Sequence, residues 1–191
     1  MTVLTSSDPL ILLLAATNSC FAQASLSPDP PSSVYFKDVD GDGKPDKFTY
    51  QIKRWENDYE GALRIVSAKG SVLWEHEYPI GKGDLNELLS TEGDATGRKV
   101  ILTDWVKKFF IGELNYGAAI ERIKIKAEDI DNEQIDYAAK LASVSPRKLK
   151  REIISQRSNT VVFYRAEWRE DLMMIVYVPS LRKFVCYSRG Y

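Results

Sequence analysis

The sequence predicts a mixed α+β fold, with an antiparallel β-meander at the N-terminal end, a helical middle and a second β-meander at the C-terminal end. Three observations support this class. Residues 47–55 alternate between apolar and polar side chains, with Phe48, Tyr50 and Ile52 on one face. Segments with helix-type spacing of apolar residues follow in the middle. The C-terminal segments are rich in β-branched and aromatic residues.

The first residues predict a secretory signal peptide. The apolar run Leu10–Ala16 is far shorter than the roughly 20 residues of a membrane-spanning helix. It is followed by Ala22-Gln23-Ala24, the small-x-small pattern of a signal-peptidase site, so we expect cleavage after Ala24. Lipidation at Cys20 is disfavoured, because the three residues before it lack the pattern of a lipoprotein signal. We therefore expect a secreted or periplasmic protein with no transmembrane segment in the mature chain.

The composition of the mature chain excludes some classes of protein. Cleavage of residues 1–24 leaves 167 residues, enough for one domain with a real core. It removes Asp8 as the single charged residue and leaves 26 basic and 26 acidic side chains, a balance that argues against nucleic-acid binding. Only Cys186 remains, so no internal disulfide is expected. The Pro/Ser-rich residues 25–34 predict a flexible leader to one folded domain, residues 35–191.

The first meander is predicted from alternation and turn chemistry. The strand at 47–55 is followed by a polar turn over residues 55–61. Two more strands, at 62–68 and 71–78, flank the dipeptide Lys69-Gly70, which is a signal for a two-residue hairpin. The N-terminal part is therefore expected to be an antiparallel meander of about three strands.

The middle of the chain mixes helical and ambiguous segments. Residues 83–93 indicate a short helix, whereas 99–111 are apolar and fit either a strand or a helix. Residues 118–126 alternate as a strand does, and 127–142 have helical spacing with acidic residues early and a lysine late. A further helix is predicted at 145–155, because Ser precedes Pro at its start. The chain closes with three predicted strands, within residues 159–168, 171–179 and 183–191.

An aspartate-rich loop opens the first meander. Four carboxylates lie within nine positions, those of Asp38, Asp40, Asp42 and Asp46. Carboxylates on alternate residues converge on one point if the chain curls around it, and Gly43 permits the sharp turn that this requires. Calcium binds six to eight oxygens, whereas magnesium prefers a few carboxylates and ordered water. The loop therefore predicts a calcium site. The alternative is a solvated acidic turn that binds no metal ion.

The pattern DVDGDGKPDKF resembles the calcium loop of FG-GAP/VCBS repeats. An EF-hand fits less well, because its twelfth position would be Thr49 in place of Glu and a strand follows in place of a helix. The FG-GAP/VCBS loop precedes a strand and supplies ligands from positions 1, 3, 5, 7 and 9. The resemblance covers a single copy of the loop, so it does not imply a propeller of repeats. It implies as ligands the carboxylates of Asp38, Asp40, Asp42 and Asp46 and the backbone carbonyl of Lys44.

Strand geometry indicates which other residues can reach the ion. A strand of eight residues spans roughly 26 Å, so the acidic residues Glu56, Asp58 and Glu60 are expected at the far end of the first sheet. Residues 67–71 come one hairpin later and return to the metal end. They, or water, are expected to complete the coordination of the ion.

Other chemical signals in the sequence are weaker. His76 is flanked by Glu75 and Glu77, but strand alternation directs both glutamates to the opposite face, and the mature chain offers no second His or Cys pair for zinc. Ser145 lies in an S-x-x-K match whose companion motifs are absent, and a helix-cap role explains it sufficiently. Cys186 alternates within a strand, where it is expected to be a buried small side chain.

The leading functional hypothesis is an exported, non-enzymatic calcium-binding protein of the cell envelope or medium, with calcium as a structural ion. One alternative is a secreted hydrolase in which calcium is structural and carboxylates carry the chemistry. Another is an envelope interaction or inhibitor protein. The basic segment 146–157 leaves open an envelope protein, glycan or anionic lipid partner, although a solvated helix face is the favoured interpretation.

Overall fold

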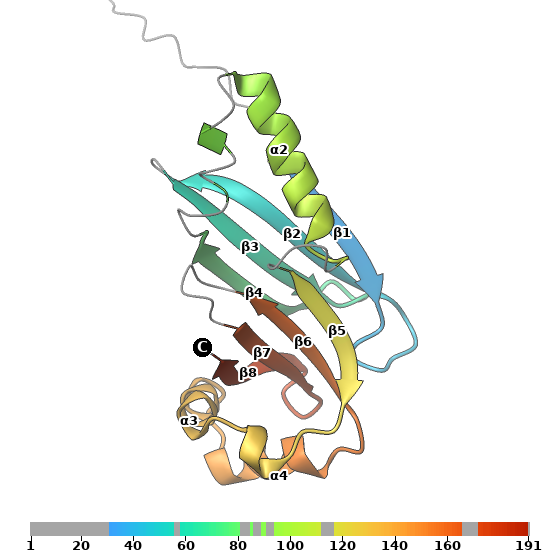
Figure 1. Ribbon diagram of the computed structural model, residues 1–191. Coiled ribbons are helices and arrows are strands. Elements are labelled where there is room, and N and C mark those ends of the chain that lie inside the picture. The colour runs from blue at the N-terminus through green and yellow to red at the C-terminus, as the bar shows by residue number, and fades with distance from the viewer. Residues whose placement is uncertain are drawn as a thin grey trace, which may run out of the picture.

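The computed structural model describes residues 31–55, 58–80, 85, 89–90, 94–111, 117–165 and 172–190. The predicted signal peptide and Cys20 lie outside these residues. Two four-stranded antiparallel sheets, each with its strands in chain order, form the body of the molecule (Figure 1). The predicted α+β class is confirmed, with an N-terminal sheet, a helical middle and a C-terminal sheet. No helix among the described residues is long and apolar enough to cross a membrane.

The first sheet contains β1 (Ser32–Lys37), β2 (Asp46–Trp55), β3 (Asp58–Val66) and β4 (Val72–Pro79). The predicted alternation in β2 is confirmed, because Phe48, Tyr50 and Ile52 are all buried. The predicted hairpin is present, but the two-residue turn expected at Lys69-Gly70 is wrong: β3 ends at Val66, β4 begins at Val72, and Ala68 and Lys69 are the central residues of the turn. The N–H of Gly70 donates to the Ser67 carbonyl at 2.8 Å, and the positive φ of Gly70, 86°, is one that glycine adopts without strain.

This sheet has one strand more than the sequence predicts. β1 begins at Ser32, within the predicted leader, and pairs with β2 over six residues. Its Tyr35 ring stacks on Phe110 at a centroid distance of 5.7 Å, so packing and pairing override the Pro/Ser-rich composition. The polar turn predicted for residues 55–61 is shorter in the structure, because β3 starts at Asp58 and Trp55 already pairs with Asp58.

The ambiguous apolar segment of the middle is helical. α2 (Ala95–Lys108) starts after Asp94, whose carboxylate accepts the Gly97 N–H at 2.6 Å as an N-cap. Its C-terminal part buries Trp105 and Val106 against the first sheet. Most of the predicted helix at 83–93 lies outside the described residues, although Leu85 is described and buried.

The second sheet contains β5 (Ala118–Ile123), β6 (Asn159–Arg165), β7 (Leu172–Val178) and β8 (Lys183–Gly190). The closing three-stranded meander is therefore confirmed. The predicted strand at 118–126 is also present, ends at Ile123 and joins this sheet as its fourth strand beside β6.

The helices predicted between β5 and β6 are confirmed. A short 3-10 helix, η1 (Ala127–Asp129), precedes α3 (Asn132–Leu141), and α4 (Pro146–Ser155) follows. Ser145 occupies the N-cap position of α4, but its side chain makes no capping hydrogen bond with the described first turn. The cap role expected for the Ser145 hydroxyl is therefore wrong, and Pro at the first helical position accounts for the helix start.

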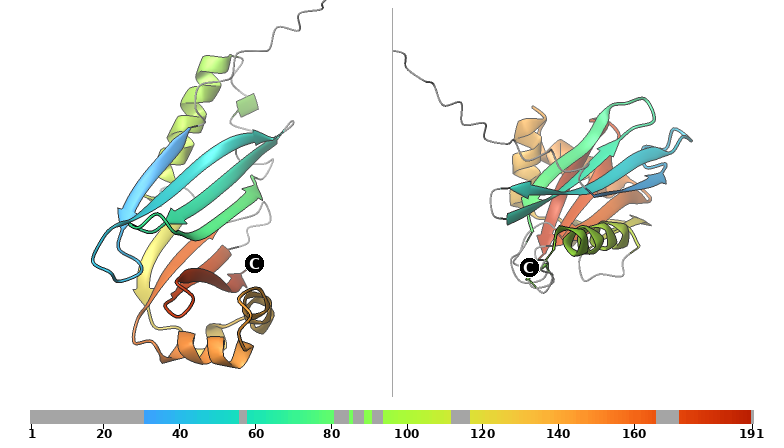
Figure 2. Two further views of the ribbon diagram at one scale, coloured as in Figure 1. Left: turned by 180° about the vertical axis from the view of Figure 1, so that it is seen from behind. Right: turned by 90° about the horizontal axis from the view of Figure 1, so that it is seen from above.

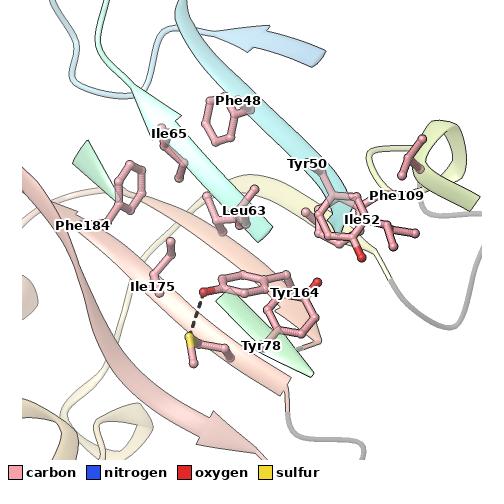
Figure 3. Packing of buried hydrophobic residues seen from close by; sticks show 14 of the residues in the cluster. Phe48, Tyr50, Ile52, Leu63, Ile65, Tyr78, Phe109, Tyr164, Ile175 and Phe184 are labelled. Carbon is pink, nitrogen blue, oxygen red and sulfur yellow. Dashed lines mark hydrogen bonds between the residues drawn. The ribbon is translucent and has the colours of Figure 1, made fainter. Parts of the chain in front are cut away.

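The second sheet is covered on both faces (Figure 2). Tyr164 of β6 faces the first sheet and shares one core with Phe48, Leu63 and other buried side chains (Figure 3). Val162 belongs to the same core. The alternate residue Val161 joins a second cluster with residues of α3 and α4. Burial on both faces explains why β6 and β7 are apolar almost throughout, whereas the strands of the first sheet alternate.

Candidate metal centre

The aspartate loop connects β1 to β2 and lies at the end of both strands (Figure 1). The pairing of Lys37 with Asp46 closes it at its base. Val39 anchors the loop, because its side chain is only 2% exposed and belongs to the core between the sheets. The loop is thus held at both ends and at one internal point, which positions its carboxylates.

Three of the predicted ligands converge. Carboxylate oxygens of Asp38, Asp40 and Asp42 lie within 4.8 Å of one another. The Asp38 carboxylate accepts the N–H groups of Gly41 (2.8 Å) and Gly43 (3.1 Å). Both glycines have φ near 80°, a conformation that side chains with a Cβ rarely adopt, so the tight curl depends on glycine at these positions.

The charges of the three carboxylates are only partly balanced by the protein. Partial burial raises the pKa of Asp40, and the neighbouring carboxylates of Asp46, Asp42 and Asp38 add to the increase, although a hydrogen bond from the Asp42 N–H opposes it. The pKa of Asp42 is lowered, above all by Lys69, whose Nζ lies 3.0 Å from Oδ2 of Asp42. A bound cation would offset the repulsion that Asp40 experiences from these neighbouring carboxylates.

Asp46 lies apart from the cluster and has a different environment. It is fully buried, at 0% exposure. Its Oδ2 accepts the N–H groups of Val39 (2.8 Å) and Asp40 (3.3 Å), and its Oδ1 accepts the N–H of Ala68 (3.1 Å). Asp46 therefore fastens the loop to the β3–β4 hairpin. Its further role as a ligand stays a prediction.

The other expected contributors lie near the loop. The N–H of Lys44 donates to Asp42 at 3.0 Å, and its carbonyl oxygen stays a predicted ligand. The hairpin of residues 67–71 lies beside the aspartate loop, as expected, because the Ala68 N–H donates to Asp46 and Lys69 pairs with Asp42.

Two neighbours of the loop were not singled out from the sequence. Lys69 was part of the hairpin expected at the metal end, so its charge could have been considered there. Tyr177 of β7 is distant in the chain and gave no signal. Its pKa is raised by burial and next by the charges of the Asp40 and Asp46 carboxylates, so Tyr177 lies within electrostatic range of the loop.

The weaker chemical signals have structural explanations. Glu75 pairs with Arg64 at 3.6 Å and Glu77 pairs with Lys53, both on the solvent-facing side of the first sheet. His76 points the other way, with Nδ1 3.3 Å from the Tyr164 hydroxyl. The predicted separation of His76 from its flanking glutamates is therefore confirmed. Cys186 is half-buried rather than fully buried.

Comparison with protein-family models, with curated proteins and with solved structures gives no match to the chain. The resemblance to FG-GAP/VCBS loops therefore rests on the pattern of residues 38–46 alone. What the structure adds is a cluster of three carboxylates with the geometry to hold a metal ion. The chemistry available to it is the binding of a hard cation through oxygen ligands.

Proposed function

We propose that this chain is an exported calcium-binding protein of the cell envelope or medium, in which calcium is a structural ion. The observation that carries the proposal is the convergence of the Asp38, Asp40 and Asp42 carboxylates within 4.8 Å. The carbonyl of Lys44 and the carboxylate of Asp46 are the further proposed ligands, and water completes the shell.

The nature of the ligands favours calcium over other metals. All the proposed donors are oxygens, which suit hard cations, and soft transition metals prefer His and Cys. Magnesium demands strict octahedral order and releases its water reluctantly. A loop with four carboxylates and a backbone carbonyl offers a higher oxygen count than magnesium usually takes from protein.

The position of the loop supports a structural role for the ion. The carboxylates converge only when β1 pairs with β2 and Val39 enters the core, so binding of the ion and folding of this edge are coupled. Asp46 extends the coupling to the β3–β4 hairpin through Ala68. Extracellular calcium modules typically bind at about 10⁻⁴ to 10⁻³ M, which matches a structural ion outside the cell.

Hydrogen exchange with calcium and with chelator tests this proposal. Calcium should slow amide exchange in the loop, residues 38–46, and in the hairpin, residues 67–71, and should leave the amides of α4 unchanged. The matched control is Asp38→Ala combined with Asp42→Ala, which should show no calcium-dependent protection. Equal exchange with and without calcium in the parent chain would refute a structural ion at this loop.

Mass spectrometry of the recovered chain tests export separately. When the chain is expressed in a secreting host, it should be recovered outside the cytoplasm with the mass of a chain that starts at Ser25. Ala24→Asp should block this cleavage, because signal peptidase requires a small residue at this position. Recovery of an unprocessed chain inside the cell would remove export from the proposal and leave the metal site unaffected.

A further inference from the structure

A cavity of about 710 Å³ opens between the two sheets, and its lining includes none of the loop aspartates. It lies between β4, α3 and β8, the strands being the outer members of their sheets. Small-molecule sites commonly have volumes of roughly 300–1,000 Å³ and a mostly apolar wall with a few polar groups. The size of this cavity is therefore that of a ligand site, and the character of its wall decides what it can bind.

The wall is apolar on most sides. Leu73, Met173 and Phe184 contribute buried side chains from β4, β7 and β8. From α3, Tyr137 and Leu141 line the mouth and stay 64% and 70% exposed. Helical spacing predicts Leu141 on the buried stripe of α3, so its exposure beside an open cavity leaves apolar surface that a ligand chain could cover.

A polar cluster lies at one end of this wall. The Nε1–H of Trp74 donates to the Tyr164 hydroxyl at 2.8 Å, and Nδ1 of His76 lies 3.3 Å from the same oxygen. The Tyr164 hydroxyl in turn donates to the sulfur of Met173 at 2.9 Å (Figure 3). Burial, and next the charge of Arg189, lower the pKa of His76, so this ring is neutral at physiological pH. The cluster is polar without carrying a charge of its own.

A β-bulge places a cation beside the cluster. Ile175 pairs with Cys186 and Met174 with Ser188, so the register skips Tyr187. Strict alternation from Cys186 would turn Arg189 away from the first sheet. With the extra residue, Arg189 pairs with Met173 and shares its face, which is the face that lines the cavity. The guanidinium is consequently near both His76 and Cys186.

The charges around the cavity are unequal. Arg189 and Lys183 are the cationic side chains that line it. Among the described lining residues Glu75 is the only acid, and its carboxylate pairs with Arg64 on the outer face of the first sheet. Burial raises the pKa of the Cys186 thiol, so it stays protonated and contributes polarisable surface. The cavity therefore combines an apolar wall with two cationic side chains, Lys183 and Arg189, at opposite ends of β8.

From this arrangement we propose that the cavity binds a small amphipathic monoanion, a carboxylate on an unbranched apolar chain. The guanidinium of Arg189 holds the carboxylate, because its planar donors match two carboxylate oxygens. The chain of the ligand lies along Leu73 and Phe184 toward Leu141. This binding site is independent of the aspartate loop and of the calcium proposal.

Decanoate, titrated into the full chain, is the probe. Trp74 lines the cavity, so saturable binding should change the tryptophan fluorescence, and calorimetry should give one site per chain. Decan-1-ol is the neutral control of equal chain length. In the parent, decanoate should bind about tenfold more tightly than decanol, because only the anion gains the charge-assisted hydrogen bonds.

Variants separate this proposal from its competitors. Arg189→Gln should weaken decanoate about tenfold and leave decanol unchanged, whereas Arg151→Gln, an equal loss of charge on the exposed face of α4, should change neither. Ala142→Trp, which fills the mouth, should weaken both ligands. Absence of decanoate binding in the parent, or equal affinity of the parent and Arg189→Gln, would overturn the proposal. So would sedimentation showing a dimer that Leu141→Glu dissociates, because a second copy would then occupy the cavity.

Discussion

Calcium should raise the melting temperature of the chelator-treated chain, and the structure allows the size of the effect to be worked out. The Asp38, Asp40 and Asp42 carboxylates converge only in the folded loop, so the unfolded chain offers no comparable site. At about 10 mM calcium, an extracellular-type dissociation constant of about 10⁻⁴ to 10⁻³ M gives a stabilisation of about 1.4–2.7 kcal/mol. With about 2.1 cal/mol/K of unfolding entropy per residue over about 160 residues, the rise is about 4–8 °C.

Differential scanning fluorimetry of the full chain, at constant ionic strength, measures this effect. The variant with both Asp38→Ala and Asp42→Ala should melt at the same temperature with calcium and with chelator. Magnesium at the same concentration should raise the melting temperature of the parent much less than calcium does. Equal calcium-induced rises in the parent and the double variant would show that the ion acts somewhere other than this loop.

Four further perturbations test particular contacts. Asp46→Ala should lower the free energy of unfolding by about 2–4 kcal/mol with or without calcium, because three backbone N–H groups lose their acceptor. Urea unfolding measures this loss. Asp38→Ala should cost much less stability without calcium, because the hydrogen-bond partners of Asp38 are exposed. Because its pKa is raised, Asp40 binds more protons in the ion-free folded chain than in the unfolded chain just above pH 3.8, so the contribution of Asp40 to stability falls as the pH rises through this window. Asp40→Asn should therefore raise the melting temperature of the calcium-free chain at neutral pH by about 1 °C and reduce the rise that calcium causes. A lower melting temperature of this variant without calcium would show that the Asp40 charge does not destabilise the ion-free loop. Lys69→Met should tighten calcium binding by about two- to tenfold in calorimetry at low salt, because the ammonium group that pairs with Asp42 is removed. Unchanged affinity would show that Lys69 moves away from Asp42 without cost. Gly61→Ala should lower the free energy of unfolding, measured with urea, by about 1–3 kcal/mol. The added Cβ would lie 2.8 Å from the Tyr78 ring and 2.9 Å from the Tyr50 hydroxyl. An unchanged free energy of unfolding would mean that these rings can shift.

Sequence patterns correctly predicted the elements that are stabilised by contacts between residues close together in the chain. The alternation of Phe48, Tyr50 and Ile52 identified β2 and its buried face, and Lys69-Gly70 identified the hairpin. The start of α4 at Pro146 followed from helix-start chemistry. In each case the residues that make the signal are the residues that make the contact.

Elements that depend on distant partners were harder to predict. The segment 99–111 is apolar on too many sides for periodicity to distinguish a strand from a helix, and its contact with the first sheet decides for the helix. β1 forms because β2 offers an edge and Phe110 a stacking partner, although its own first residues have the composition of a leader.

The same distinction applies to the sites. Asp38, Asp40 and Asp42 are close in the chain, so their convergence was predictable from spacing. The approach of Tyr177 to the loop depends on the packing of one sheet on the other. The direction of Arg189 depends on a bulge that skips Tyr187, and alternation alone would have placed this side chain on the wrong face.

Isothermal titration calorimetry of calcium into the chelator-treated full chain measures directly whether the aspartate loop binds the ion. We expect one calcium ion per chain, a dissociation constant of about 10⁻⁴ to 10⁻³ M and a much weaker response to magnesium. The variant with both Asp38→Ala and Asp42→Ala should give no binding heat. A parent chain that takes up no calcium, or a double variant that binds it as the parent does, would contradict a metal centre at the β1–β2 loop.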